Sequence, residues 1–377
     1  MKFRVERDAL ADAVAWTAKS LPNRPSVPVL AGVLLRVTDG TLQVSGFDYE
    51  VSTEVTVDVH GDADGAALVS GRLLAEITKA LPDKPVDIAA VGAHLELICG
   101  SARFTLPTMP VEDYPTLPEM PASAGRVDAA AFATAVQQVA VAAGRDETLP
   151  MMTGVRIELN GSTLALLATD RYRLALREME WHPDDPDVSL NALVPARTLA
   201  DTAKALGPLG GVVTLALAPG GAGEGMIGFA GGNRRTTSRL IDGSNYPPVR
   251  SLFPTTHNAQ ARVSVPALVE VVRRVALVAE RTTPVLLNFS ADGLIVEAGG
   301  TEEARASEAM EADYTGEPLT IGFNPQYLID GLQNVGASHA LMSFVDAFKP
   351  AVIAPADENG EVLPDYRYLI MPIRVTR

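Results

Sequence analysis

The chain carries one pattern three times, and this repetition constrains its fold more than any other feature. The stretches VLLRVTDGTLQVSG, VRIELNGSTLALLA and VLLNFSADGLIVEA begin at Val33, Val155 and Val285. Each is an alternating apolar and polar run, a turn, and a second alternating run. The turns carry dipeptides that accept the positive φ of a tight hairpin: Asp39-Gly40, Asn160-Gly161 and Asp292-Gly293. The sequence therefore predicts three antiparallel hairpins at equivalent places in three repeats.

A helix is predicted before each hairpin. The segments VERDALADAV, VDAAAFATAV and VSVPALVEVV begin at Val5, Val127 and Val263. Their apolar stripes recur at steps of four, three and four residues, which is one face of an α-helix. The stripes are Leu10, Val14, Thr17 and Leu21; Phe132, Val136, Val139 and Ala143; and Leu268, Val272, Val275 and Ala279.

A second helix is predicted after each hairpin. ALVSGRLLAEITKAL from Ala67 and ALVPARTLADTAKAL from Ala192 are identical at 9 of 15 positions. IGFNPQYLIDGLQNV from Ile321 is a more diverged third copy. All three keep a seven-residue apolar spacing, as Leu74 to Leu81, Leu199 to Leu206 and Leu328 to Val335.

Proline-rich stretches divide the repeats. PTLPEMPASAG follows Tyr114 and NYPPVRSLFPTT follows Ser244, and such segments break helices and central strands. We expect three domains at residues 1–121, 122–256 and 257–377. Each is expected to be an α+β unit with two helices on one face of an antiparallel sheet.

Composition narrows the class of protein. A chain of 377 residues exceeds what one core usually supports, and 47% hydrophobic with 20% charged residues is typical of globular proteins. No apolar run reaches the roughly 18 residues of a membrane span, and MKFRVERDAL lacks a signal-peptide core. The single cysteine, Cys99, is expected to be a buried strand residue. The sequons at Asn160 and Asn288 are then chance matches in a cytoplasmic protein.

Catalytic motifs are weak or missing. Gly223 to Gly228 matches G-x-G-x-x-G but does not open a periodic helix, so a hairpin loop is predicted there in place of a dinucleotide site. No Walker-type loop occurs, and the five histidines have no metal-ligand spacing. We expect no enzyme activity, no cofactor and no metal.

Two of the second helices share a basic pair. Arg72 and Lys79 lie about 200° around the axis from Leu74 and Leu81, and Arg197 with Lys204 repeats the arrangement. A pair seen once indicates a solvated surface. Seen twice in register it suggests a local anion-binding track, although the formal net charge is -15 and the third copy lacks the pair.

The whole chain resembles the bacterial DNA polymerase sliding clamp, the β subunit of polymerase III. The resemblance rests on MKFRVERDAL, RPSVPVL from Arg24, TDRYRLAL from Thr169, LIDGSNYPPVRSLFP from Leu240, IGFN from Ile321 and YLIMPIRV from Tyr368. It implies a head-to-tail homodimeric ring of six similar domains, with helices lining the hole, sheets outside and double-stranded DNA passing through without sequence preference. A few cations inside an acidic ring would centre DNA without gripping it.

Site residues follow from the resemblance. Arg72, Lys79, Arg197 and Lys204 would line the pore, and Arg24 would contact phosphate. An apolar groove would receive short peptides of the replicative polymerase, the clamp loader and other proteins with a clamp-binding motif. Its lining would be Met152, Thr169, Leu174, Pro247, Leu252, Pro350, Leu369 and Met371, with Arg171, Tyr172, Arg173, Pro372, Ile373 and Arg374 at the rim or floor. Methionine, leucine and proline suit an adaptable apolar floor, and the arginines would orient the peptide.

The resemblance also pairs domain one of one chain with domain three of another. Arg103 and Leu106 would face Leu277, Val278, Glu303 and Glu308 of the partner. Leu277 and Val278 lie off the core stripe, which suits burial in a partner, although packing within domain three explains them equally well.

One departure and one alternative stay open. Some relatives carry arginine or tyrosine where this chain has Leu149, Pro150 and Met151, so a DNA contact from the loop that begins at Gly144 is in doubt. A protein-interaction scaffold of repeated domains, with no DNA through it, would share the repeats and the groove. It would not need the basic pairs on the second helices.

Overall fold

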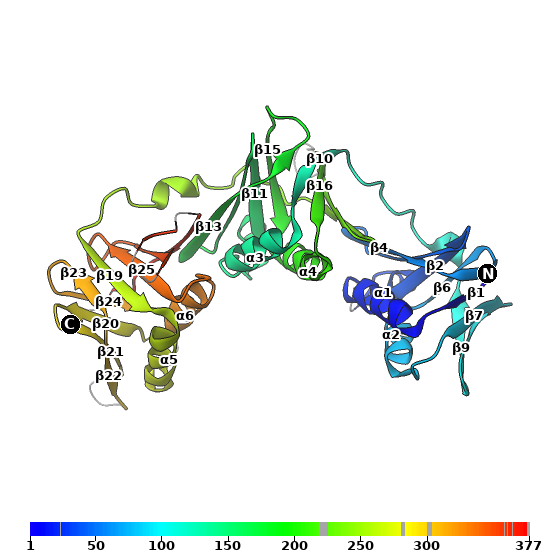
Figure 1. The fold of residues 1–377 in the computed structure, drawn as a ribbon, viewed down its shortest axis with the longest axis horizontal. Coiled ribbons are helices and arrows are strands. Elements are labelled where there is room, and N and C mark those ends of the chain that lie inside the picture. Colours follow the sequence, from blue (N-terminus) through cyan, green and yellow to red (C-terminus); the bar gives the residue numbers. More distant parts are fainter. Residues whose placement is uncertain are drawn as a thin grey trace. The chain divides into compact units, whose positions relative to one another are not determined.

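The computed structural model describes residues 1–22, 24–218, 225–279, 283–299, 304–357, 359, 361–363 and 365–374. They form two compact units (Figure 1). The first comprises Met1–Ala133, His182–Pro186 and Asp201–Leu240, and the second comprises Thr134–Trp181, Asp187–Ala200 and Ile241–Arg377. The cut passes through the predicted middle domain, because five of its strands share a sheet with the first repeat and four share a sheet with the third.

The first repeat opens with a strand and a helix and continues through the predicted hairpin. Its elements are β1 (Lys2–Val5), α1 (Arg7–Lys19), the 3-10 helix η1 (Pro28–Ala31), β2 (Gly32–Thr38), β3 (Thr41–Phe47), β4 (Val51–Asp58), β5 (His60–Ala63), β6 (Gly65–Ser70), α2 (Gly71–Ala80), β7 (Val86–Val91), β8 (His94–Cys99), β9 (Ala102–Met109) and η2 (Val111–Asp113).

The second repeat follows the same order of strands and helices. Its elements are β10 (Ser123–Asp128), α3 (Ala129–Ala140), η3 (Pro150–Met152), β11 (Gly154–Asn160), β12 (Thr163–Thr169), β13 (Arg173–Glu180), β14 (His182–Pro183), β15 (Ser189–Pro195), α4 (Ala196–Leu206), η4 (Gly207–Leu209), β16 (Val212–Ala218), β17 (Met226–Gly231), β18 (Arg234–Arg239) and η5 (Val249–Leu252).

The third repeat completes the chain. Its elements are β19 (Ala259–Ser264), α5 (Val265–Val275), η6 (Ala276–Val278), β20 (Val285–Ser290), β21 (Gly293–Ala298), β22 (Ala306–Met310), β23 (Asp313–Thr315), β24 (Leu319–Phe323), α6 (Pro325–Gln333), β25 (His339–Phe344), β26 (Ala351–Ala356) and β27 (Tyr366–Ile370). The recurring order confirms the predicted α+β repeats with antiparallel sheets.

Each unit contains a sheet that runs from one repeat into the next. In the first unit the order is β14-β10-β16-β17-β18-β4-β3-β2-β6-β9-β8-β7-β1-β5, and in the second it is β15-β11-β12-β13-β27-β26-β25-β19-β23. A separate sheet of the second unit has the order β22-β21-β20-β24. The pairing of β4 with β18 is the first joint between repeats, and the pairing of β13 with β27 is the second joint.

The hairpin turns confirm the predicted hairpins but not all of the predicted turn residues. In the first, Asp39 and Gly40 both take positive φ, at 49° and 74°. In the second, Asn160 already pairs with Thr163, so the turn is formed by Gly161 and Ser162. In the third, Ser290 pairs with Gly293, so Asp292 needs no positive φ and Gly293, at 122°, supplies it. The alternating pattern predicts that a hairpin forms. Which two residues form its turn depends on the register of the two strands, which the pattern does not specify.

The predicted apolar stripes form the cores. Leu10, Val14 and Leu74 are fully buried in the first repeat, where α1 and α2 pack against each other on one face of the sheet (Figure 1). Leu268 of α5 and Leu328 of α6 are buried in the same way in the third repeat. Cys99 is a free, buried cysteine in β8, as predicted. No helix among the described residues is long and apolar enough to cross a membrane.

Candidate partner-binding site

An apolar cluster at the second joint gathers three segments that are distant in sequence. Its buried members come from β12, β13, η5 and β27: Ala165, Leu167, Leu174, Leu176, Val249 and Leu369. Tyr246 and Phe253, on either side of η5, pack against them. Leu174 lies directly opposite Leu369 in the strand register. Burying one leucine stabilises a fold by about 1.5–3 kcal/mol, so this cluster anchors the linker to the sheet.

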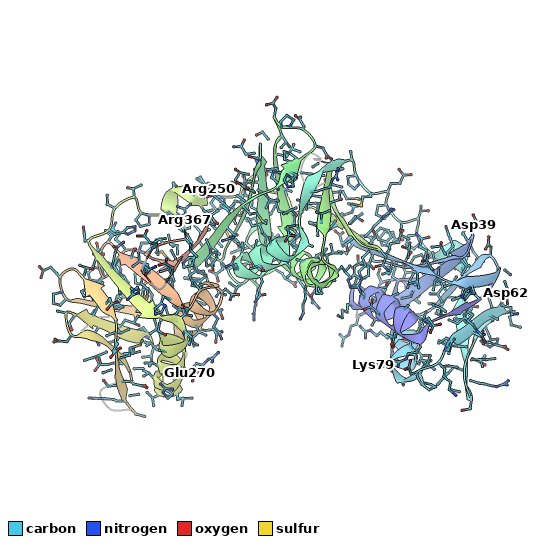
Figure 2. All side chains as sticks on the ribbon, in the orientation of Figure 1. Asp39, Asp62, Lys79, Arg250, Glu270 and Arg367 are labelled. Carbon is cyan, nitrogen blue, oxygen red and sulfur yellow. The ribbon has the colours of Figure 1, made fainter. Side chains whose placement is uncertain are left out.

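Two arginines also hold the same linker. Arg250 donates to Glu158 at 2.9 Å and to Glu178 at 2.8 Å. Arg367 of β27 places its guanidinium 4.8 Å from the ring centre of Phe253, and Figure 2 shows Arg250 and Arg367 in the same part of the second unit. Each exposed ion pair contributes at most about 1 kcal/mol, so the apolar cluster stabilises the linker more than the arginines do.

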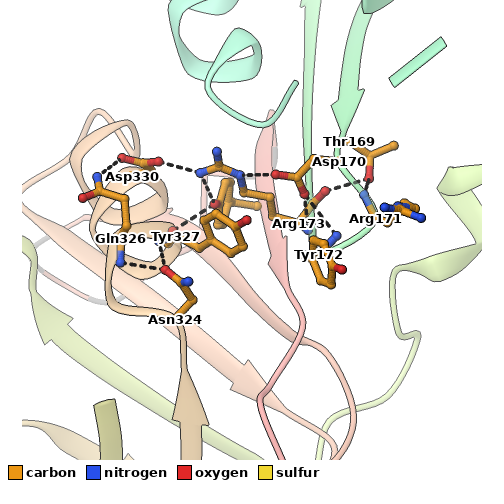
Figure 3. A network of polar contacts seen from close by, with 10 residues as sticks. Thr169, Asp170, Arg171, Tyr172, Arg173, Asn324, Gln326, Tyr327 and Asp330 are labelled. Atoms are coloured by element: carbon orange, nitrogen blue, oxygen red, sulfur yellow. Dashed lines mark hydrogen bonds and ion pairs between the residues drawn. The ribbon is translucent and has the colours of Figure 1, made fainter. Parts of the chain in front are cut away.

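The turn between β12 and β13 has an unusual backbone. Arg171 takes φ of 78°, which side chains other than glycine rarely adopt. The Asp170 carboxylate accepts hydrogen bonds from the backbone N–H groups of Tyr172 and Arg173 at 3.0 and 3.1 Å. The Thr169 hydroxyl donates to the Arg173 carbonyl at 2.7 Å (Figure 3). Local side-chain bonds therefore hold the left-handed residue and leave the Arg171 and Tyr172 side chains exposed.

Arg173 is engaged by its own chain. Its Nε donates to Asp170 at 2.9 Å and its Nη1 donates to Asp330 of α6 at 2.6 Å, so the guanidinium lies between the two carboxylates in Figure 3. The side chain is buried, and its guanidinium lies 4.3 Å from the ring centre of Tyr327. We expected Arg173 to orient a bound peptide. The structure gives it an internal role, because it links the second repeat to the third.

Exposed apolar side chains surround the buried cluster. Leu252 is 54% exposed, Tyr172 53% and Met371 40%. Of the other predicted lining residues, Met152, Pro247, Pro350, Pro372 and Ile373 are half-buried, Arg374 is exposed and Thr169 is buried. Leu174 and Leu369 are fully buried, so they belong to the core beneath the surface and not to its exposed lining.

Sequence reasoning missed one exposed aromatic side chain. Phe348, 64% exposed, sits in the turn between β25 and β26, where Asp346 accepts the backbone N–H groups of Phe348 and Lys349. Ala351 lies opposite Ile370, so this turn adjoins the segment that begins at Met371. The motif D-x-F-K-P indicates a turn in the sequence, but nothing in it indicates that this turn lies close to the C-terminal segment.

The C-terminal segment is tied to both repeats. The backbone N–H of Met371 donates to the Tyr172 carbonyl at 2.8 Å, and that of Ile373 donates to the Gly322 carbonyl of β24 at 2.8 Å. Residues 371–374 thus bridge the β12–β13 turn and the separate four-stranded sheet.

The first joint repeats the turn but fills the space beside it. Asp48 accepts the N–H groups of Glu50 and Val51 at 2.9 and 2.7 Å, and Tyr49 takes φ of 75°. Phe47 occupies the place of Thr169 and is buried in a cluster with Tyr114. The Phe47 ring thus fills space in the first joint that the smaller Thr169 side chain does not fill in the second joint.

The linkers differ as well. Met120 follows Tyr114 by six residues, as Leu252 follows Tyr246. Met120 packs on Gly228, where a Cβ would lie 3.0 Å from the Met120 methyl group. Val352 occupies the equivalent strand position in the second joint, since it lies opposite Leu369 as Gly228 lies opposite Thr237. The second joint consequently leaves Leu252 exposed, whereas Met120 is half-buried.

Comparisons with known proteins assign the family. The models for the N-terminal, central and C-terminal domains of the DNA polymerase III beta subunit match residues 1–118, 126–248 and 250–374. This chain belongs to the bacterial β sliding clamp family. It is 53% identical to the beta sliding clamp of Streptomyces coelicolor and 42% identical to the clamp homologue GriR of Streptomyces muensis, each over all of both chains.

Solved clamp structures agree. The DnaN sliding clamp of Pseudomonas aeruginosa, solved with griselimycin, superposes with a TM-score of 0.91 at 29% identity over all of both chains. The chain is therefore a sliding clamp, a non-catalytic processivity factor of DNA replication whose partners are DNA and the polymerase. None of these matches supports the scaffold alternative.

The clamp exposes all four predicted basic residues of its second helices. Arg72 and Lys79 of α2 and Arg197 and Lys204 of α4 are exposed, and Lys79 is labelled on α2 in Figure 2. Arg24, in the loop before η1, is exposed as well. The apolar partners Leu74, Leu81, Leu199 and Leu206 are buried, which agrees with the predicted separation of the two helix faces.

The predicted subunit surface of the clamp requires one correction. Leu106 is 2% exposed and belongs to the core of the first repeat, where it lies opposite the buried Leu95 in the register of β8 and β9. It is not available to a partner. Phe104, two residues earlier and 37% exposed, is the apolar side chain that β9 presents to solvent.

The other residues of that surface are accessible or already paired. Arg103 is exposed, Leu277 is 84% exposed and Val278 is half-buried. Glu308 accepts two hydrogen bonds from Arg274, at 3.0 and 2.7 Å, and this partner lowers the pKa of Glu308. Glu303 lies outside the described residues.

Proposed function

We propose that the clamp closes as a head-to-tail homodimeric ring around duplex DNA and is loaded by the clamp loader. Its three domains would be residues 1–121, 122–256 and 257–377. The polymerase and the loader would take turns at the apolar surface of the second joint. The observation that carries the ring proposal is the common register of the two joints.

Both joints pair the same two strands of consecutive repeats. Val55 of β4 lies opposite Arg234 of β18, and Arg177 of β13 lies opposite Tyr366 of β27. Counted from the hairpin turns, Val55 and Arg177 occupy the same repeat position, because Val55 pairs with Val44 and Arg177 pairs with Leu166. Glu308 of β22 occupies this position in the third repeat, since it pairs with Val296.

The third repeat lacks the corresponding neighbour. The outer edge of β22 pairs with no strand within the described residues. In the first repeat, β9 pairs with β8 along its length but with β6 only at Thr108 and Met109. An unpaired strand edge is a template for another chain. The free part of β9 is equivalent to β18 and β27, which fill the two joints.

Extending the register gives a specific interface. Glu308 would lie opposite the partner subunit's Ala102, and Ala306 would lie opposite the partner subunit's Phe104. Leu277, on η6 directly after α5, would be covered together with Val278, since α5 contacts β22. The partner subunit's Arg103 would lie opposite Ser307, on the sheet face that also carries Glu297, where charges of opposite sign favour a single register.

The peptide site would lie over the cluster of the second joint. The exposed side chains of Leu252, Met371 and Phe348 are suited to aliphatic or aromatic anchors of a short peptide. Arg171 and Arg374 would orient its carboxylate or backbone groups. Half-buried Met152, Pro247, Pro350, Pro372 and Ile373 would complete the lining, with Thr169, Leu174 and Leu369 beneath it.

Arg24, Arg72, Lys79, Arg197 and Lys204 would supply the DNA contacts. Five cations per chain on an otherwise acidic protein suit a ring that centres a duplex and slides, because affinity rises with each phosphate neutralised.

The decisive experiment uses the variant Ala102→Cys/Glu308→Cys. These two positions would form a pair without backbone hydrogen bonds, whose short separation suits a disulfide. The variant is loaded on nicked circular DNA by the clamp loader, oxidised and then denatured. We expect a covalent dimer that stays on the circle after denaturation and leaves it when the circle is linearised.

The matched control is Ala102→Cys/Ser307→Cys, which shifts the register by one residue and turns one side chain to the other face of the sheet. Efficient cross-linking of the control alone would contradict the register. A covalent dimer of the first variant that is not retained on the circle would contradict encirclement and favour the scaffold alternative.

A further inference from the structure

The ion pair between Arg173 and Asp330 connects the turn of the second repeat to a helix of the third. Asp330 is 19% exposed as a side chain and Arg173 is 8% exposed. The second carboxylate oxygen of Asp330 accepts the Gln326 side-chain amide at 2.7 Å, so the carboxylate is fixed from its own helix as well. Charges this far from water are costly unless their geometry is good, and here both groups have further partners.

The first joint provides an internal control for what this pair does. There, Val51 stands where Arg173 stands in the second joint, because each follows the three-residue turn directly. The two turns nevertheless share their positive φ, 75° and 78°, and their carboxylate-capped N–H groups. The turn therefore forms without an arginine at this position. Arg173 must serve something that only the second joint has.

What the second joint adds is a ring stack across the repeats. Tyr172 of the turn and Tyr327 of α6 stack with their centroids 6.3 Å apart and an interplanar angle of 27°. The Arg173 guanidinium lies on the Tyr327 ring, and the Tyr172 carbonyl accepts the N–H of Met371. The pair formed by Arg173 and Asp330 thus connects the turn that carries Tyr172 to the helix that carries Tyr327.

The helix that carries Asp330 is itself a rigid support. Asn324 caps α6 by accepting the N–H groups of Gln326 and Tyr327. A Cβ on Gly331 would lie 2.5 Å from the Tyr368 ring, so α6 approaches β27 as closely as a glycine permits. The Tyr368 hydroxyl donates to the Tyr327 carbonyl at 2.9 Å.

We propose that Asp330 is a positioning residue for peptide recognition: through Arg173 it locks the 170–172 turn to α6, and so holds Tyr172 and Tyr327 as one preformed wall of the peptide site. This inference rests on the proposed function of the second joint. Asp330 itself does not touch the peptide. A wall that is ordered in advance lowers the ordering cost of binding, so its loss reduces affinity without the loss of a contact.

The test is Asp330→Asn, which keeps the shape of the side chain and leaves Arg173 paired with Asp170. Binding is measured with a fluorescently labelled peptide that carries the clamp-binding segment of the replicative polymerase. We expect about tenfold weaker binding, the size of effect that coupling residues outside a site produce. The loss should fall mainly on the association rate, with the dimer mass and the thermal unfolding midpoint little changed. Arg173→Val/Asp330→Asn, which copies the turn of the first joint, should fold and show the same loss.

The control is Asp12→Asn, which breaks another arginine–aspartate pair between consecutive repeats, that of Asp12 with the buried Arg234 in the first unit. It should leave peptide affinity unchanged. A second readout separates positioning from general destabilisation: in a Tyr172→Ala background, Asp330→Asn should have no further effect on affinity, because the wall is already absent.

Unchanged affinity in Asp330→Asn, or an equal loss with and without Tyr172, would overturn the inference. These outcomes differ from failure of the peptide site as such, which would appear as full affinity in Met371→Ala.

Discussion

One pair of equivalent residues, Thr169 and Phe47, illustrates how the two joints come to differ. Both end the second strand of a hairpin and precede the same capped turn. The Phe47 ring packs in the buried cluster of the first joint. The smaller Thr169 donates its hydroxyl to the Arg173 carbonyl and leaves the space beside it unfilled by its own side chain. Differences of single side chains on one backbone therefore accompany the exposure of Leu252 at the second joint, where the equivalent Met120 of the first joint is half-buried.

Met371 is the single residue whose truncation should test the peptide site most directly. It is 40% exposed beside the buried cluster, so Met371→Ala removes an anchor surface without opening a core cavity. We expect binding of the polymerase peptide to weaken by about tenfold or more, as for a hot-spot residue. Fluorescence anisotropy with a labelled peptide measures this.

Val362→Ala is the matched control, because Val362 is also 40% exposed and belongs to the same repeat. It should bind the peptide like the unmodified clamp, and both variants should keep the solution mass of the unmodified clamp. Equal affinity in the Met371 and Val362 variants would remove Met371 from the site.

The burial and the long-range contacts of individual residues were harder to predict than their membership of a motif. Leu106 and Phe104 are apolar residues on the same face of β9, and each lies opposite a buried leucine of β8, yet only Leu106 is buried. Arg173 was recognisable as part of the motif TDRYRLAL, but its partner Asp330 is 157 residues away and carries no local signal. Contacts between distant segments are therefore the part of the site that sequence reasoning could not supply.

At the scale of elements, the repeat made the helices and hairpins predictable. Helix periodicity and hairpin alternation are local patterns, and the structure confirms them in all three copies. The two joints were not predictable, since β4 and β18 pair although they are far apart in the sequence, and no local pattern marks their edges. The basic pairs of α2 and α4 lie between these cases: their exposure is confirmed, and their contact with DNA stays a prediction.

Arg197→Ala/Lys204→Ala tests the basic face of α4. If both side chains approach phosphates, the slope of log affinity against log salt should fall by about 2, since each neutralised phosphate contributes about 0.9. Anisotropy titrations with a short duplex at several salt concentrations give the slope.

Lys2→Ala serves as the charge control, because Lys2 lies on the sheet strand β1 and pairs with Asp62. Its slope should equal that of the unmodified clamp. An unchanged slope in the α4 double variant would exclude this helix face from the DNA-binding surface.

At the scale of the whole molecule, tyrosines at the two joints make the free energy of unfolding depend on pH in the alkaline range. Burial raises the pKa of Tyr114, in the first joint, and of Tyr246, in the second, to about 12. Burial also raises the pKa of Tyr366 and Tyr368 in β27. A folded-state pKa above the unfolded value of 10.0 means that folding favours the neutral phenol.

The sign of the pH dependence follows. The stabilisation from these tyrosines is complete below pH 10 and is lost as the pH rises through their folded-state pKa values. We expect the urea midpoint of unfolding to fall progressively from pH 10 to pH 12, and phenol ionisation in the native clamp to lag behind that of the urea-unfolded chain. A urea midpoint that stays constant over this range would contradict the buried, neutral state of these side chains.

The incomplete edges of β9 and β22 have a consequence for assembly. In the proposed assembly each chain would carry two different, complementary sides, and assembly through such sides has no fixed size, because every addition leaves one free side of each type. Growth ends only when the last free side meets the first. The number of chains in a closed particle is then decided by the bend at each joint and not by the chemistry of the edges. A substitution that altered this bend while sparing both edges would convert a closed particle into an open filament, which can enclose nothing.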